Sequence, residues 1–426
     1  MNIPSIKPFL IAEYKERLIS NLLDQKRFNE ACDDLSGFVN SLCFSDEFKG
    51  KQIYLPNLDD LVERIGIETL QPITTKKLLK NLRYPVIVAT EMYVDGGHSR
   101  IIEELIRLRG GIVVLTNYFG GFDKTKADPP KANLPVLTLP VDSPTNNIIR
   151  LNNICNAVGS EVYVLTHHHD VVATAAVSCA MSIPVYFIHH SDHKVSLGPT
   201  IKNFIHVDIA PHVHEICSKF LKPKIEYWPQ GVDDLGLKIF TYPLNEVCSA
   251  SSGSWHKFSW EGEYAYPKII RILLSRPGSS HFHIGILSDS LLKKIKEELK
   301  TNAIPLERFH YIGHVQSLWQ ALLDLPVNVF VGSCPMHGLR TAIEVQGSGV
   351  PIIPFLQSED TLLYDKSFYN NQTVFWSSPE KLDSITQEVL NKHHFMAAAS
   401  RRHYEETFHP NLMKEAIDQS ILYYRN

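Results

Sequence analysis

Residues 84–117 read YPVIVATEMYVDGGHSRIIEELIRLRGGIVVLTN and hold one complete strand–turn–helix–strand unit. The runs YPVIVAT and GIVVLTN are short and apolar, which predicts two buried strands. Between them, GGHSRIIEELIRL combines a glycine turn with the apolar spacing of a helix. Strands that alternate with helices predict a parallel, doubly wound sheet covered on both faces.

The same alternation continues downstream in two successive series. The first series continues through VLTLP, EVYVLTH and IPVYFIHH and closes around IEYWPQGVDD at 225–234. The second begins near 247 with VCSASSG and continues through HFHIGIL, FHYIGHV, VNVFVGS and VPIIPF. The predicted fold class is therefore α/β, with two Rossmann-like domains facing each other across a cleft. Ligands of such sheets bind beyond the carboxyl ends of the strands, so the loops after the apolar runs carry the candidate site residues.

Residues outside these series complete the predicted domain organisation. FLIAEYKERLISNLLDQKRF and NLDDLVERIGIETL have helical spacing and predict a small helical N-terminal appendage at 1–80. We expect the first domain at 84–232, the second at 245–405, and a C-terminal helix at 406–426 that packs back across the domain junction. WPQGVD at 228–233 is interpreted as a hinge around Gly231, although it could also contribute backbone to the cleft.

The overall composition excludes several classes of protein. The 426 residues are 44% hydrophobic and 21% charged, with a formal charge of -4, which gives no electrostatic case for a nucleic-acid partner. No apolar run fits a signal peptide or approaches the roughly 18 residues of a membrane span, so we expect a cytoplasmic protein, with peripheral membrane association left open. Seven scattered cysteines without a Cys-x-x-Cys pair are interpreted as reduced core thiols.

Two histidine runs follow predicted strands directly, HHHD at 167–170 and HHSDH at 189–193. Imidazoles at strand ends can act as general bases, bind sugar hydroxyls or phosphate, or hold a metal. Neighbouring residues of an extended chain point to opposite faces, and neither run has the His-x-x-x-His spacing of a strong zinc site, so no metal site is predicted. The alternative is that these histidines only shape the strand ends. The candidates are His168 and His169 on the acceptor side and, as catalytic residues, His189, His190, Asp192 and His193.

The loop DGGHSR at 95–100 places Gly96, Gly97 and His98 at the start of a helix in the first domain. Two glycines let the backbone approach a ligand closely, and helix amides would point into the cleft. The loop could equally be an ordinary turn. It lacks the Gly-x-Gly-x-x-Gly pattern, so it does not support a nicotinamide cofactor.

SASSGSWHKF at 249–258 places Gly253 and Lys257 after the first strand of the second domain. A cation at this position could neutralise a diphosphate leaving group, although a surface lysine is the common alternative.

PMHGLRTAIE at 335–344 places a helix start directly after a predicted strand. Free amides at such a start bind phosphate, and one turn further in Glu344 could accept hydrogen bonds from a ribose diol. The alternative is an exposed helical glutamate. The predicted nucleotide site of the second domain comprises Gly253, Lys257, His337, Gly338, Leu339, Arg340, Thr341 and Glu344.

With these motifs, residues 84–424 resemble GT-B fold glycosyltransferases, the group that includes glycogen synthases and bacterial mannosyl- and N-acetylglucosaminyltransferases. Members of that group have a Gly-Gly loop, matched by Gly96 and Gly97, and histidines after a middle strand, matched by the runs at 167–169 and 189–193. Their turn into the second domain is matched by residues 230–233. In their Glu-x7-Glu signature the second glutamate is Glu344, but the first falls on Met336. Their arginine upstream of the phosphate-binding lysine falls on Ser252, which leaves Lys257 alone.

The resemblance implies transfer of a sugar from a nucleotide diphosphate sugar, with UDP favoured, to a glycan or protein acceptor, without a metal or other cofactor. A protein acceptor is suggested by analogy, because protein-modifying members often have a helical N-terminal region. Three rival functions stay open: a sugar-nucleotide epimerase on the same plan, a metal-dependent hydrolase built on the histidine runs, and a nucleotide-binding protein without turnover.

Overall fold

The predicted α/β fold is confirmed by a computed structural model with two parallel sheets. The structure describes residues 7–43, 45, 54–70, 83–93, 97–119, 135–179, 181–190, 194–221, 225–242, 244–258, 261–335, 338–356 and 366–425. The chain divides into two compact units, which we call unit 1 (residues 1–228 and 416–426) and unit 2 (residues 229–415).

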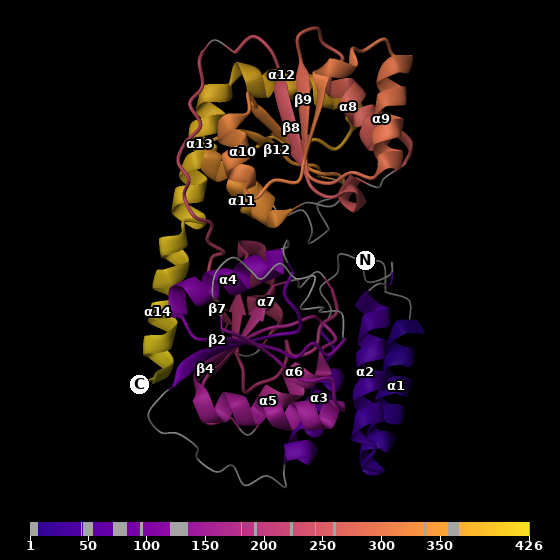
Figure 1. Cartoon of the computed structure of the whole chain (residues 1–426), viewed down its shortest axis with the longest axis vertical. Helices are drawn as coiled ribbons and strands as arrows, with labels where there is room; N and C mark the ends of the chain where they lie inside the picture. The colour runs from indigo at the N-terminus through magenta and orange to yellow at the C-terminus, as the bar shows by residue number, and fades with distance from the viewer. Residues whose placement is uncertain are drawn as a thin grey trace. The chain divides into compact units, whose positions relative to one another are not determined.

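Unit 1 is built on a seven-stranded parallel sheet with the order β3-β2-β1-β4-β5-β6-β7. The strands are β1 (Tyr84–Ala89), β2 (Ile112–Leu115), β3 (Val136–Thr138), β4 (Gly159–Leu165), β5 (Val185–His189), β6 (Ile205–Asp208) and β7 (Ile225–Tyr227). Its helices are α1 (Lys7–Asp24), α2 (Phe28–Cys43), α3 (Pro56–Leu70), α4 (Gly97–Arg109), α5 (Pro144–Val158), α6 (Val171–Ser178) and α7 (Pro211–Phe220). Figure 1 shows α4 and α5 on opposite faces of the sheet, as the sequence pattern predicts.

The N-terminal helices share one hydrophobic core with this sheet. Val62 and Ile65 of α3 are fully buried and belong to the same cluster as Ala175 of α6 and Val162 of β4. Asp59 of α3 is also buried, and its carboxylate accepts hydrogen bonds from the backbone N–H groups of Gly198 and Thr200. The segment predicted at 1–80 is therefore helical in its described part and packs against α6.

Unit 2 is built on a five-stranded parallel sheet with the order β10-β9-β8-β11-β12. The strands are β8 (Cys248–Ser252), β9 (Ser280–Ile284), β10 (Phe309–Gly313), β11 (Val329–Val331) and β12 (Ile352–Ile353). The α-helices are α8 (Tyr266–Leu273), α9 (Asp289–Thr301), α10 (Leu318–Asp324), α11 (Leu339–Ser348), α12 (Pro379–Asn391) and α13 (His393–Thr407), and the short 3-10 helices are η1 (Trp255–Phe258), η2 (Gly262–Tyr264), η3 (Leu306–Arg308) and η4 (Lys366–Phe368). Helices α8 and α9 lie to one side of the sheet, and α10 and α11 to the other (Figure 1).

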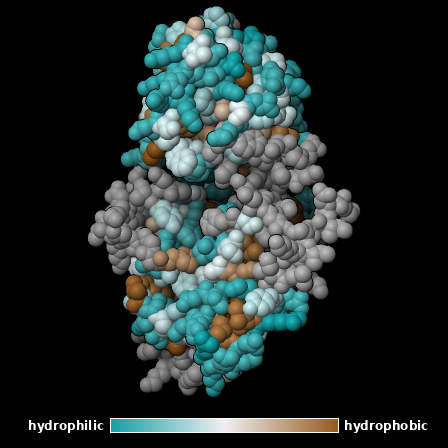
Figure 2. Space-filling model, turned by 90° about the vertical axis from the view of Figure 1, so that its right-hand side faces the viewer, coloured by the Kyte–Doolittle hydropathy of each residue, from teal (hydrophilic) through white to brown (hydrophobic). Residues whose placement is uncertain are grey.

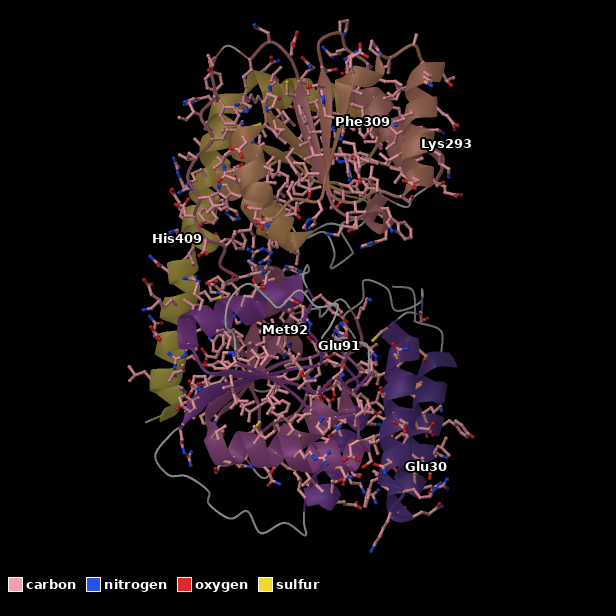
Figure 3. All side chains as sticks on the ribbon, in the orientation of Figure 1. Glu30, Glu91, Met92, Lys293, Phe309 and His409 are labelled. Carbon is pink, nitrogen blue, oxygen red and sulfur yellow. The ribbon has the colours of Figure 1, made fainter. Side chains whose placement is uncertain are left out.

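Helix α9 shows how the sequence pattern selects the buried face. Ile295 and Leu299 are fully buried, whereas Lys293 points away from the sheet into solvent (Figure 3). The surface of unit 2 in Figure 2 is accordingly mostly hydrophilic.

The boundary between the units falls between Trp228 and Pro229, inside the predicted hinge segment. A Cβ atom on Gly231 would lie 2.8 Å from Cα of Pro410, so the chain packs closely at that glycine. Helix α14 (Pro410–Arg425) begins in unit 2, and its residues from 416 onward belong to unit 1. Among the described helices, none combines the length and apolar character that a membrane crossing requires.

Candidate functional site

In each unit the strand order locates one crevice for a ligand. In unit 1 the connections that leave β1 and β4, two neighbouring strands, go to opposite sides of the sheet, and in unit 2 the same holds for β8 and β11. Such a reversal separates the two loops at the carboxyl ends of the strands, where ligands of open α/β sheets bind. The relevant loops therefore follow Ala89 and Leu165 in unit 1, and Ser252 and Val331 in unit 2.

Four histidines gather at the crevice of unit 1, and we call His98, His167, His168 and His190 the imidazole group. The His98 ring centroid lies 5.0 Å from that of His190 and 5.6 Å from that of His167, and the rings of His168 and His190 stack at 6.0 Å. The group draws on α4 and on the segments after β4 and β5, so residues almost 100 positions apart meet. Predicted residues His98, His168 and His190 are thus brought together.

Burial keeps two of these imidazoles, His98 and His190, neutral near pH 7. It lowers the pKa of His98 to about 4, and with the neighbouring rings of His98 and His168 it holds the pKa of His190 well below its usual value. Nε2 of His98 donates to the carbonyl oxygen of Leu165 at 2.7 Å, because a carbonyl can only accept. In a neutral ring Nδ1 then carries a lone pair, and this atom is buried without a hydrogen-bond partner in the described part of the chain. A neutral imidazole of this kind can accept a proton from a hydroxyl group.

Other predicted residues of unit 1 lie at the edge of this group or elsewhere. Gly97 is exposed with open space where a Cβ would stand, and His169 packs on Phe119 at 4.2 Å between ring centroids. His189 is fully buried on the other side of its strand, where Nε2 lies 2.9 Å from Nδ1 of His206. Gly96, Asp192 and His193 lie outside the described residues, as does His337 of unit 2.

Two buried acids at the unit 1 crevice were not among the predicted site residues. Glu91 lies two residues after the end of β1 (Figure 3) and is 4% exposed. It accepts a hydrogen bond from the hydroxyl of Tyr93, whose ring stacks on His167 at 6.1 Å. Asp170 caps α6 through Ala173 N–H and accepts from the hydroxyls of Thr90 and Thr116 at 2.7 and 2.6 Å. Glu91 could have been predicted as a site residue, because it comes directly after the apolar run YPVIVAT.

Removing the Asp170 carboxylate should loosen this crevice and destabilise unit 1. Asp170→Ala leaves two buried hydroxyls and the Ala173 amide without their acceptor, so we expect a loss of about 2–4 kcal/mol in unfolding free energy by urea denaturation. Asp60→Ala, at an exposed acid of α3, is the control and should change stability by less than about 0.5 kcal/mol. Equal stability of the two variants would contradict the anchoring role.

In unit 2 the loop after β8 is shaped by two glycines. Gly253 has φ +147° and Gly285, after β9, has φ +133°, conformations that L side chains rarely adopt. A Cβ on Gly285 would lie 2.3 Å from the carbonyl oxygen of Gly253, so the two loops approach closely. The amide of Gly253 donates to the carbonyl of Ile284 at 3.0 Å, which fixes the loop that leads into Lys257.

Lys257 and the start of α11 lie side by side. The position of a Cβ atom on Gly338 would be 2.9 Å from Nζ of Lys257 and 2.7 Å from Oγ1 of Thr341. Gly338 is the N-cap of α11 and has no side-chain capping bond. Burial lowers the pKa of Lys257, and no carboxylate of the described residues pairs with its ammonium group. Helix amides and an unpaired ammonium at one point form an anion-binding arrangement.

Glu344 lies one turn further into α11 and is already hydrogen-bonded. Nε of Arg340 donates to Oε1 at 3.0 Å, and the backbone N–H of Trp319 donates to Oε2 at 3.3 Å. The carboxylate can accept further hydrogen bonds, since each oxygen has two lone pairs. Arg340, predicted in the phosphate site, is hydrogen-bonded to Glu344, and Leu339 is exposed.

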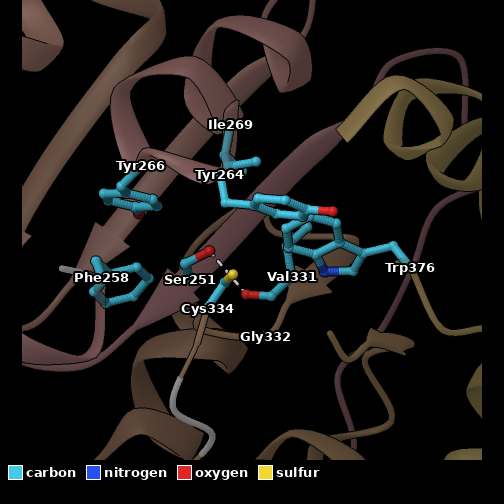
Figure 4. A pocket seen from close by; sticks show the side chains of 9 residues that line it. All are labelled: Ser251, Phe258, Tyr264, Tyr266, Ile269, Val331, Gly332, Cys334 and Trp376. Atoms are coloured by element: carbon cyan, nitrogen blue, oxygen red, sulfur yellow. Dashed lines mark hydrogen bonds between the residues drawn. The ribbon is translucent and has the colours of Figure 1, made fainter. Parts of the chain in front are cut away.

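A small aromatic pocket in unit 2 is lined by residues of β8, η1 and η2 (Figure 4). Tyr264, Tyr266, Phe258 and Trp376 line it, together with Cys334 after β11. Ser251 of β8 donates to the carbonyl of Val331 at 2.8 Å and so ties the two strands together at its floor.

Buried histidines connect this region to the core of unit 2. The hydroxyl of Tyr266 lies 3.0 Å from Nε2 of His281 and 2.7 Å from Nδ1 of His283, and Nε2 of His283 contacts the carbonyl of Gly253 at 3.2 Å. Burial lowers the pKa of His281 to about 3 and that of His283 to about 4.

The protein should therefore lose stability in mild acid. Unfolding returns each histidine to a pKa of about 6.5, so the unfolded chain binds protons first as the pH falls below that value. Stability is complete above pH 6.5 and should fall by about 2 kcal/mol per such histidine between pH 6.5 and 5. Urea titrations at several pH values measure this slope, which should be shallower in His281→Gln. Stability that stays constant down to pH 5 would contradict it.

Comparisons with known proteins support the fold. No protein-family model matches the sequence, and no curated protein matches it either. Among solved structures, HepE from Anabaena in complex with UDP is similar with a TM-score of 0.59 and 13% identity over 79% of this chain and 99% of that chain. A glycosyltransferase from Rickettsia africae is similar with a TM-score of 0.56 and 15% identity, over 79% of this chain and 97% of that chain. An O-GlcNAc transferase from Thermobaculum terrenum is similar with a TM-score of 0.50 and 12% identity, over 96% of this chain and 83% of that chain. The chain thus has the GT-B fold of these glycosyltransferases, as predicted.

Proposed function

We propose that the protein is a glycosyltransferase that moves a sugar from a nucleotide diphosphate sugar to a hydroxyl or amide group of a glycan or protein acceptor. The observation that carries the proposal is the contact between the Lys257 ammonium and the start of α11 at the ligand crevice of unit 2. UDP is the favoured nucleotide, because HepE, which is similar in fold, is complexed with UDP.

Each residue of the unit 2 site has one role in this proposal. Lys257 and the amides from Gly338 to Thr341 bind the diphosphate and stabilise the charge that develops as the bond to the sugar breaks. Glu344, oriented by Arg340, accepts hydrogen bonds from the ribose hydroxyls. Lys257 takes the part that a divalent metal has in other sugar transferases, so turnover should not depend on added Mg²⁺.

We assign the acceptor to unit 1 and its imidazole group. If the reaction inverts the sugar, a base must take the proton of the acceptor hydroxyl. His190 and His98 are neutral near pH 7, and His98 has a buried lone pair at Nδ1. His189 is not proposed as this base, because its ring is buried on the other side of β5. We expect the reaction in the cytoplasm.

A donor screen tests the proposal. The protein is incubated with UDP-, GDP- and ADP-sugars, with and without glycan or peptide acceptors, and the products are analysed by mass spectrometry. Sugar transfer, or slow release of UDP from a UDP-sugar without acceptor, supports the proposal. An isomerised donor would instead identify an epimerase, and tight nucleotide binding without any turnover would identify a binding protein.

A further inference from the structure

A buried cluster at the opposite side of β5 from the imidazole group has no part in the proposed reaction. It comprises His189 at the end of β5, Asp208 at the end of β6 and Cys217 in α7, all at most 2% exposed. Nδ1 of His189 lies 3.4 Å from Oδ1 of Asp208 and 3.7 Å from Sγ of Cys217. One ligand atom from each of the three residues falls within 4.8 Å of the other two.

The hydrogen bonds behind His189 determine which of its nitrogens carries a proton. Nε2 of His206 lies 2.8 Å from the carbonyl oxygen of Ile201, and a carbonyl only accepts, so this nitrogen carries a hydrogen. In a neutral His206, Nδ1 is then an acceptor, and it receives the hydrogen of Nε2 of His189 at 2.9 Å. Nδ1 of a neutral His189 therefore has a lone pair, and this lone pair faces Asp208 and Cys217.

Without a cation nearby, the buried carboxylate of Asp208 would cost folding free energy. Both of its carboxylate oxygens are buried and neither has a hydrogen bond in the described structure. Nδ1 of His189 and Nδ1 of His214 each lie 3.4 Å from it, and the buried hydroxyl of Tyr227 also interacts with its charge. A buried carboxylate normally has hydrogen bonds or a positive partner, because removing it from water is expensive. Here it faces a nitrogen lone pair instead.

The geometry also differs from that of a nucleophilic relay. In a Cys-His-Asp relay the cysteine and the acid contact opposite nitrogens of the imidazole. Here Asp208 and Cys217 both approach Nδ1, while Nε2 is bonded to His206. Three electron-rich atoms that converge on one point are the pattern of ligands around an ion.

We propose that His189, Asp208 and Cys217 bind one zinc ion, whose fourth position is left to a water molecule. Imidazole, carboxylate and thiolate together suit Zn²⁺, and Zn–N and Zn–S bonds of about 2.0 and 2.3 Å place neighbouring ligand atoms about 3.3–3.6 Å apart in a tetrahedron. The separations of 3.4 and 3.7 Å from Nδ1 of His189 fit this geometry. One thiolate and one carboxylate balance the charge of Zn²⁺, which suits a buried site.

The surroundings match those of a metal site. His206 orients His189 from behind, in the way that outer hydrogen bonds orient ligating histidines. The hydroxyl of Tyr54 lies 3.1 Å from Sγ of Cys217 and can donate to a thiolate. The side chain of His214 is 33% exposed, so an ion can reach the cluster from solvent on that side. The ligands come from three separate elements, so no short sequence spacing could predict them. The ion would fasten α7 to the ends of β5 and β6.

Metal analysis of the full-length protein, purified without a histidine tag, tests this proposal. After incubation with Zn²⁺ and removal of the excess, we expect about one zinc per chain. Cys217→Ser and Asp208→Asn should lose this zinc, whereas the control Cys155→Ser, at another fully buried thiol of unit 1, should keep it. The melting temperature should rise with Zn²⁺ in the wild type and in Cys155→Ser, but not in Cys217→Ser.

A second measurement does not depend on the folding of the variants. Co²⁺ added to metal-free wild-type protein should produce a thiolate-to-cobalt charge-transfer absorption that saturates at one equivalent and disappears when Zn²⁺ is added. If the wild-type protein binds neither ion stoichiometrically, the proposal is wrong. The three side chains would then share a proton instead of a metal ion. Zinc retained in folded Cys217→Ser would overturn it too.

Discussion

Replacing Lys257 with alanine is expected to lower the turnover of the nucleotide sugar by about 10²–10³-fold, the range seen when one group that stabilises developing charge is removed. The diphosphate gains charge as the bond to the sugar breaks, and Lys257 is the cation placed beside the start of α11. Steady-state kinetics with the donor found in the screen measure the change. The loss should appear mainly in kcat, because the diphosphate carries more negative charge in the transition state than in the bound donor.

The stability of this variant separates a functional role from a structural one. The ammonium of Lys257 has no ion pair among the described residues, and burial lowers its pKa, so its removal should cost little folding free energy. Lys268→Ala, at an exposed lysine of α8, is the matched control and should leave both turnover and stability unchanged. Full activity in Lys257→Ala would remove Lys257 from the mechanism.

A single methyl group on Gly338 is expected to weaken UDP binding by about tenfold, the loss of roughly one charge-assisted hydrogen bond. The added Cβ would lie 2.9 Å from Nζ of Lys257 and 2.7 Å from Oγ1 of Thr341, so both groups must move away from the proposed phosphate site. Nζ of Lys257 is the end of a flexible side chain, Oγ1 of Thr341 can move by rotation about one bond with a small shift of its Cβ at 3.2 Å, and Gly338 has a φ of -109° that alanine adopts freely. The fold should therefore tolerate Gly338→Ala.

Calorimetry and thermal unfolding together measure this effect. Gly37→Ala is the control, because Gly37 lies in α2 with open space around its Cβ position. It should leave UDP affinity at the wild-type value. If Gly338→Ala binds UDP as tightly as the wild type, the diphosphate does not contact this helix start.

Much of the fold could be predicted from the sequence because its signals are local. Short apolar runs such as YPVIVAT give the strands directly, and the loops after them give the carboxyl edge of each sheet. The sequence placed Lys257 and Gly338 in loops at the carboxyl edge of the second sheet, and the structure brings them together because β8 and β11 are neighbouring strands. Strand order itself is set by long-range packing, which local patterns do not contain.

The parts that sequence reasoning missed depend on which face of a strand a residue occupies and on contacts between distant elements. His189 and His190 are adjacent in sequence, yet one joins Asp208 and Cys217 and the other joins His98 and His168. Asp170 was noted only as the end of the HHHD run, but its partners Thr90 and Thr116 are more than 50 residues away. The bond from Arg340 to Glu344 within the same helix was likewise not part of the sequence-based prediction.

Backbone amide chemical shifts during a UDP titration test the central claim most directly. If the start of α11 and Lys257 bind the diphosphate, UDP should bind at one site and shift the amide resonances from Gly338 to Ala342 strongly, while that of Gly37 stays in place. UDP that fails to bind, or that binds and leaves the amides at 338–342 unshifted, would contradict the account.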